Sequence, residues 1–131
     1  MKTIRLILGD QLNEKHTWFE ELNEDVVYLM AEVRQETDYA PHHIQKVVGI
    51  FVAMRSVAHL LREAGHNVQY ISLDAANNPQ IFKKIILDFA TEIEAKRFEY
   101  QEPDEYRLDI QLMEIAALFD HSNVSSTEHF L

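Results

Sequence analysis

Polar side chains that can bind a small molecule follow directly after a short apolar run near the N-terminus. The run spans residues 3–8, and the loop after it consists of Gly9, Asp10, Gln11, Leu12 and Asn13. Glycine has no Cβ, so the backbone there can turn sharply or approach a ligand closely. In open α/β sheets, ligands bind at the carboxyl ends of the strands. This loop is therefore the first candidate site, and the rest of the chain is expected to hold it in place.

Several acidic residues are candidates for acid–base chemistry, which needs carboxylates in pairs. They are Asp10, Glu32, Glu36, Glu102, Asp104 and Glu105. Acids at strand ends and helix starts also cap helices and interact with the helix dipole. The spacing favours these structural roles over catalysis, and no serine or lysine stands in a recognisable nucleophile motif.

Three further groups have both a functional and a structural interpretation. His42 and His43 are adjacent on an expected helix, where side chains point about 100° apart, so a solvated helix start is favoured over a shared metal. His42 or His43, together with Lys46, remains able to contact a ligand from the first turn, where backbone N–H groups are free. Tyr106 and Arg107 suit a planar ligand, or equally an ordinary helix start with the ring packed at its edge.

Strands and helices are expected to alternate along the chain. Apolar runs predict five strands, over residues 3–8, 26–31, 67–73, 97–100 and 123–127. Trp18, Phe19 and Leu22 indicate a short helix or packed turn, with Trp18 at the core edge rather than stacked on a ligand. Apolar stripes predict three helices: residues 41–64, with Val48 and Val57 widening the stripe; one that starts at Pro79; and one that carries Leu108, Leu112, Ile115 and Phe119.

Alternation of this kind predicts a Rossmann-like, three-layer α/β/α fold with a parallel five-stranded sheet. Right-handed crossovers give the strand order 3-2-1-4-5. The switch point then lies between the first and fourth strands. Residues 9–13 and 102–107 are expected to face each other there, and residues 32–39 to flank them. Residues 1–131 are expected to form one domain.

Composition excludes several classes of site. The chain has 131 residues and a net charge of −10, which argues against a nucleic-acid-binding surface on it. It has no cysteine, which excludes disulfides, thiol catalysis and thiolate metal sites, and its three glycines cannot build a dinucleotide fingerprint or a P-loop. Without a signal peptide or a long apolar stretch, the expected location is the cytoplasm.

In their order, several segments resemble the N-terminal domain of bacterial deoxyribodipyrimidine photolyase-related proteins, in the prokaryotic cryptochrome/(6-4) photolyase branch. The segments are residues 6–12, 30–33, 39–46, 51–55, 64–66, 70–74 and 102–107. They extend over nearly the whole chain. Each is weak alone, and together they are fairly specific.

The resemblance implies that this domain binds an antenna chromophore, 6,7-dimethyl-8-ribityllumazine. It also implies a helical C-terminal domain that holds FAD and a 4Fe–4S cluster and binds damaged DNA. In that scheme the antenna passes light energy to the flavin of a DNA photolyase. The present chain would be the antenna domain alone, without catalytic activity of its own, and its partners would be the C-terminal domain and the chromophore.

The resemblance also implies which residues form the antenna pocket. Gly9, Asp10, Gln11 and Leu12 would line it, Glu36 and Tyr39 would lie beside it, and Glu36 would bond the lumazine ring or ribityl chain. Weaker candidates are Glu32, His43, Lys46 and Arg107.

Three alternatives remain open from the residues themselves. The chain could be a stand-alone small-molecule or nucleotide-binding or signalling module, against which the shortage of glycine argues. It could be a small hydrolase or transferase that uses strand-end carboxylates, or a structural domain with an empty pocket.

Overall fold

The computed structural model describes residues 2–33, 44–76 and 78–126, and the side chains of residues 48–76 within the second of these ranges. In chain order the elements are β1 (Lys2–Leu6), the 3₁₀ helix η1 (Thr17–Phe19), β2 (Val26–Ala31), α2 (Ile44–Glu63), β3 (Asn67–Ile71), α3 (Phe82–Ile93), β4 (Ala95–Gln101), α4 (Tyr106–Ala116) and β5 (His121–Ser125).

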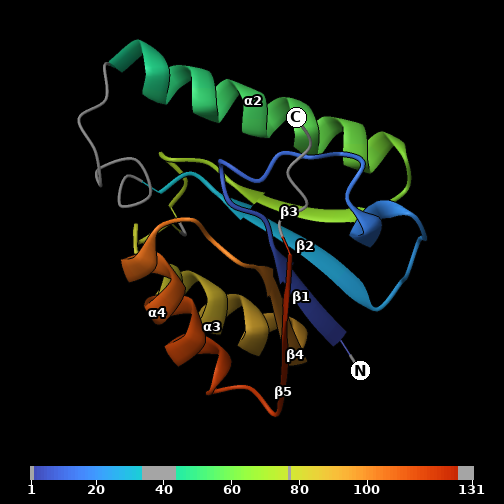
Figure 1. Cartoon of the computed structure of the whole chain (residues 1–131). Coiled ribbons are helices and arrows are strands. Elements are labelled where there is room, and N and C mark those ends of the chain that lie inside the picture. The colour runs from blue at the N-terminus through green and yellow to red at the C-terminus, as the bar shows by residue number, and fades with distance from the viewer. Residues whose placement is uncertain (1, 34–43, 77, 127–131) are drawn as a thin grey trace.

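The five strands form one parallel sheet in the order β3-β2-β1-β4-β5, as predicted (Figure 1). In the register of the sheet, Leu6 of β1 lies beside Leu29 of β2 and Tyr100 of β4. The carboxyl ends of β1 and β4 are therefore neighbours at the switch point, where the chain reverses its direction of travel across the sheet.

The helices cover the two faces of the sheet, so the fold is Rossmann-like with three layers (Figure 1). On one face, α2 packs through Phe51, Met54, Ala58 and Leu61 against a cluster that includes Trp18. On the other face, α3 and α4 enclose the larger cluster, which contains Ile4, Leu29 and Phe98 among its buried residues. Buried apolar side chains on both faces explain why β2 is a continuous apolar run.

Several predicted boundaries were wrong by a few residues. The helix expected to start at Pro79 begins at Phe82, because Gln80 has a φ of 64° and Ile81 is extended. The last strand is residues 121–125 rather than 123–127, and β4 begins at Ala95 rather than at residue 97. β1 and β3 end two residues early, although residues 7 and 8 are buried.

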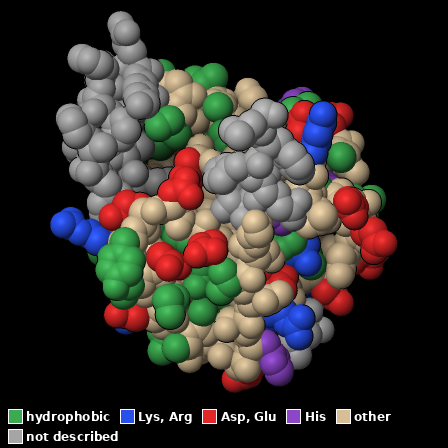
Figure 2. Space-filling model, in the orientation of Figure 1, with side chains coloured by type: hydrophobic (Ala, Val, Ile, Leu, Met, Phe, Trp, Pro, Cys, Tyr) green, Lys and Arg blue, Asp and Glu red, His purple; other side chains and the backbone are tan. Residues whose placement is uncertain are grey.

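Side-chain exposure also corrects some details of the helices. Val48 does not widen the buried stripe of α2, since it is 54% exposed, and Phe119 packs on the core from beyond the end of α4. Tyr106 is 74% exposed and does not pack at the helix edge. With Ile110 and Met113 it gives α4 an apolar outer surface, and Figure 2 shows green side chains gathered in that region. Within the described residues, no helix has the length and apolarity to cross a bilayer.

Candidate functional site

The loop after β1 is held to the end of β4 by the side chain of Gln11. The Gln11 side chain accepts a hydrogen bond from the Leu8 backbone N–H through Oε1 (3.2 Å) and donates one to the Gln101 carbonyl through Nε2 (3.1 Å). The Gln11 backbone N–H also donates to the Leu8 carbonyl (3.0 Å). Gln11 is buried, so its amide serves as an internal bridge across the switch point.

Gln101, the last residue of β4, presents the opposite situation. Its side chain is fully buried, yet among the described residues neither its Oε1 nor its Nε2 has a hydrogen-bond partner. Alternation along the strand places it on the same face as Glu99, which bonds Arg5 at 2.8 Å. A buried amide without partners costs roughly 1–3 kcal/mol, so such groups are rare and call for an explanation.

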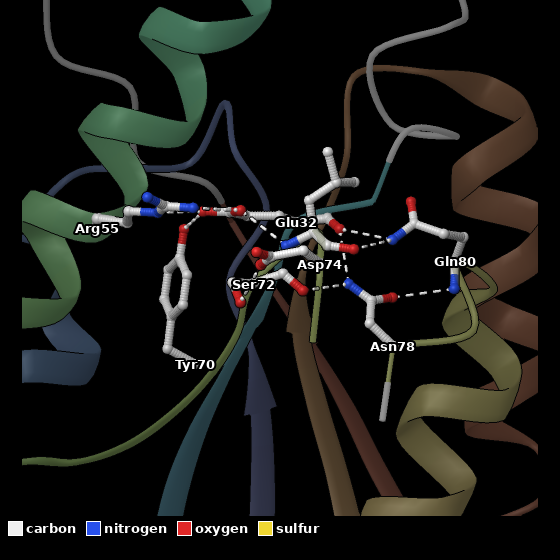
Figure 3. A network of polar contacts seen from close by, with 8 residues as sticks. Glu32, Arg55, Tyr70, Ser72, Asp74, Asn78 and Gln80 are labelled. Atoms are coloured by element: carbon white, nitrogen blue, oxygen red, sulfur yellow. Dashed lines mark hydrogen bonds and ion pairs between the residues drawn. The ribbon is translucent and has the colours of Figure 1, made fainter. Parts of the chain in front are cut away.

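Glu32, directly after β2, is the centre of a network that joins four segments (Figure 3). Its fully buried carboxylate accepts two hydrogen bonds from Arg55 of α2, at 2.6 Å from Nε and 2.8 Å from Nη2. It also accepts from the Tyr70 hydroxyl of β3 and from the Leu73 backbone N–H at 2.9 Å. All of its strong acceptor positions are thus directed to groups of the protein itself.

The same network fixes the loop between β3 and α3. The backbone carbonyl of Glu32 accepts from Asn78 Nδ2 (2.9 Å) and Gln80 Nε2 (3.2 Å), as Figure 3 shows. Asn78 also bonds the Ser72 carbonyl and receives the Gln80 backbone N–H. These contacts explain why Gln80 adopts its positive φ and why α3 starts late.

The electrostatics of the network favour a charged Glu32. Burial by itself would raise the pKa of Glu32, but the hydrogen bonds from Arg55, Tyr70 and the Leu73 N–H lower it below its ordinary value. Burial and the neighbouring carboxylate raise the pKa of Tyr70, so its hydroxyl keeps its proton and remains a donor. The arrangement is a stable ion pair with a neutral phenol. It suits a structural role, in which it holds α2 and β3 to the end of β2, better than proton transfer.

The other predicted site residues are dispersed. Asp10 is exposed, while Gly9 and Leu12 are half-buried and Leu12 packs against the α2-side cluster. Arg107 is exposed in the first turn of α4, on the opposite face of the sheet from α2. Glu36, Tyr39 and His43 lie outside the described residues, as does the side chain of Lys46.

Sequence reasoning missed Arg55, Tyr70 and Gln101. Arg55 is one polar residue among many on a long helix, and nothing in its spacing marks it. Tyr70 is the middle residue of the strand predicted over residues 67–73. For Gln101 a signal exists, because this polar residue directly follows the strand predicted over residues 97–100. That position is where ligands meet an α/β sheet.

The hollows in the described part of the surface include one of about 840 Å³ between α3 and the segment after α4. One of about 280 Å³ lies between β3 and α3, lined in part by Gln69, Ile85 and Phe89. Another, of about 330 Å³, lies beside Arg5 and Trp18. None of these three hollows is lined by residues 9–12, so the candidate site rests on its polar groups and its place at the switch point.

Comparison with known proteins identifies the family. The family model for deoxyribodipyrimidine photo-lyase-related proteins matches residues 5–131. A curated relative, named (6-4) photolyase, from Agrobacterium fabrum, is 31% identical over 134 residues, covering 100% of this chain and 26% of the relative. The chain thus spans about a quarter of that relative's length. It belongs to the deoxyribodipyrimidine photo-lyase-related protein family.

Proposed function

We propose that this chain is the antenna-chromophore-binding domain of a photolyase-like flavoprotein that acts in light-dependent DNA repair. The observation that carries the proposal is the family match over residues 5–131. The curated relative is named a photolyase, and its remaining length offers room for a catalytic domain. FAD, a 4Fe–4S cluster and the DNA-binding surface are assigned to that other part. The cluster fits this assignment, since the present chain has no cysteine to ligate it.

The proposed ligand is 6,7-dimethyl-8-ribityllumazine, bound at the carboxyl edge near the switch point. When bound, this group absorbs light and supplies excitation energy to the flavin. Gly9 offers a backbone without a side chain, Asp10 an exposed carboxylate and Leu12 an apolar contact. Glu36 and Tyr39 remain predicted contacts. The unpartnered amide of Gln101 supports the fit, because it leaves a polar group at this edge that the protein does not satisfy.

Two predicted residues take a different part in this proposal. The amide of Gln11 and the carboxylate of Glu32 are both bonded within the protein. They therefore position the loops around the ligand rather than contact it through these groups. Lys46, His43 and Arg107 remain weaker candidates for contact.

The test is a fluorescence titration of the protein with 6,7-dimethyl-8-ribityllumazine, in this chain and in the full-length protein. We expect saturable binding that Glu36→Ala weakens and that Glu24→Ala, a change of an exposed acid in the turn before β2, leaves unchanged. A folded full-length protein with no response would overturn the proposal. Binding of nucleotides in place of lumazine would instead favour a stand-alone nucleotide-binding module.

A further inference from the structure

Two buried glutamines meet at the switch point, and they differ in one respect. Gln11 has hydrogen bonds on both ends of its side-chain amide, whereas Gln101 has none on either end within the part of the chain that the structure describes. Both are almost inaccessible to solvent, at 2% and 0% exposure. The chain thus contains a matched pair: one amide that stabilises the fold and one that does not.

The backbone of Gln101 is held firmly although its side chain is not. Its carbonyl accepts from Gln11 Nε2, and the next residue, Glu102, donates its N–H to the Ser125 carbonyl at 2.8 Å. Gln101 is therefore fixed between β1 and β5 at the edge where ligands of such sheets bind. A fixed backbone with an uncommitted donor and acceptor is the arrangement of a preorganised recognition group.

An apolar residue of similar size would fill the same space without leaving polar atoms unsatisfied. The end of β2, which β1 separates from β4 in the sheet, shows the alternative, since Glu32 is as deeply buried but fully bonded. Among the described residues, the buried carboxylate of Glu32 after β2 therefore has hydrogen-bond partners, and the buried side-chain amide of Gln101 at the end of β4 has none. The unsatisfied amide is the one nearest to the switch point.

We propose that the side-chain amide of Gln101 is a recognition group of the carboxyl-edge site, and that it selects a ligand with adjacent N–H and C=O groups. A primary amide carries a carbonyl acceptor beside an N–H donor, so it pairs with a cyclic amide or imide through two hydrogen bonds. The pyrimidine-dione ring of a lumazine has such an edge. The inference rests on the proposed function. It adds which residue recognises the ligand, and which N–H and C=O groups of the ligand that residue bonds.

The experiment compares Gln101→Met with Gln11→Met in the same chain, by urea unfolding and by lumazine titration. We expect Gln101→Met to retain or increase the stability of the protein while it weakens lumazine binding by about tenfold. Gln11→Met is the matched control, and we expect it to lower stability because it breaks two internal hydrogen bonds. A stability gain coupled to a loss of binding is not expected of a merely structural residue.

A second readout uses the wild-type protein and a changed ligand. A lumazine methylated on the imide nitrogen keeps its carbonyls but lacks the N–H that Gln101 Oε1 would accept. We expect the wild type to bind this analogue about tenfold more weakly than the parent lumazine, and Gln101→Met to bind the two ligands alike.

The outcomes separate the two proposals. If the wild type binds lumazine but Gln101→Met binds it equally well, the recognition role is wrong and the proposed function stands. If Gln101→Met destabilises the protein as much as Gln11→Met does, the amide is satisfied internally, for example by a buried water, and the inference is also wrong. If the wild type binds no lumazine, the proposed function fails and the inference fails with it.

Discussion

At the scale of single residues, Glu32 is the most consequential polar group in the described structure. It joins β2, α2, β3 and the β3–α3 loop through its carboxylate and its backbone carbonyl. A buried carboxylate is tolerated because Arg55, Tyr70 and a backbone N–H satisfy it. Its place beside the candidate site makes it a positioning residue for the loops after β2 and β3.

Glu32→Gln is expected to lower the free energy of unfolding at pH 7 by about 2–3 kcal/mol, because it removes the charge from a buried, hydrogen-bonded pair. The effect should depend on pH. The pKa of Glu32 is lower in the folded protein than its ordinary value of 4.5, so its contribution is complete above that value and is lost as the pH falls through the folded pKa. Urea unfolding of the wild type and of Glu32→Gln, from neutral pH to values below 4.5, measures the difference in their free energies of unfolding.

Tyr70→Phe is the control for this prediction. It removes one donor to Glu32 and leaves the Arg55 pair and the charge in place, so its cost should be smaller, about 1–2 kcal/mol. A difference between wild type and Glu32→Gln that stayed constant from neutral to acidic pH would show that the charge of Glu32 does not contribute to stability.

The sequence pointed to Glu32 as an acid after a strand, but it could not reveal the partners. Arg55 and Tyr70 lie 23 and 38 positions away, and only the packing of α2 and β3 around the end of β2 brings them to the carboxylate. Gln101 was missed for a related reason. Its significance lies in the partners that its amide lacks, and a sequence does not show which polar groups remain unpaired.

At the scale of elements, two glycines of the α2 region offer a comparison. Gly49 lies inside α2, and an added Cβ would meet no described atom within 4 Å. Gly65 follows the helix with a φ of 101°, a backbone conformation that favours glycine, and a Cβ there would lie 3.1 Å from Leu22 Cδ1.

The same substitution should therefore act in opposite directions at the two positions. Gly49→Ala is expected to stabilise the protein by about 0.5–1 kcal/mol, since alanine is the better helix former. Gly65→Ala should destabilise it by about 1–2 kcal/mol, because alanine disfavours positive φ. Thermal or urea unfolding of the two variants checks both signs, and a loss of stability in Gly49→Ala would point to a contact made by residues outside the described part.

Most elements could be predicted because their apolar patterns are strong. Continuous apolar runs marked β1 and β2, and the alternation of strands with helices was enough to give the strand order. The errors lie where tertiary contacts override local pattern. Pro79 looked like a first helical residue, but Asn78 and Gln80 bond the end of β2 instead and delay α3. The fold was thus predictable, while the loops at the carboxyl edge of the sheet were not.

At the scale of the whole molecule, net charge determines which partners the chain can bind by itself. It carries 22 acidic and 12 basic residues, and a net charge of −10. In Figure 2, acidic side chains are spread over the visible face and the basic ones among the described residues are scattered. Affinity for duplex DNA depends on basic groups that displace counterions from the phosphates. A surface of this charge agrees with the proposed role of the chain in binding a small molecule.

We accordingly expect this 131-residue chain not to bind duplex DNA, whether or not the duplex carries a pyrimidine photoproduct. Fluorescence anisotropy of a labelled duplex, with salt varied between roughly 50 and 200 mM, measures this directly. Because repulsion between like charges grows as salt is removed, low salt should not rescue binding. The full-length protein is the positive control. Binding by the chain alone, with an affinity that falls as salt rises, would mean that its few lysines and arginines form a phosphate-binding surface, and the DNA contacts would then have to be assigned to this domain.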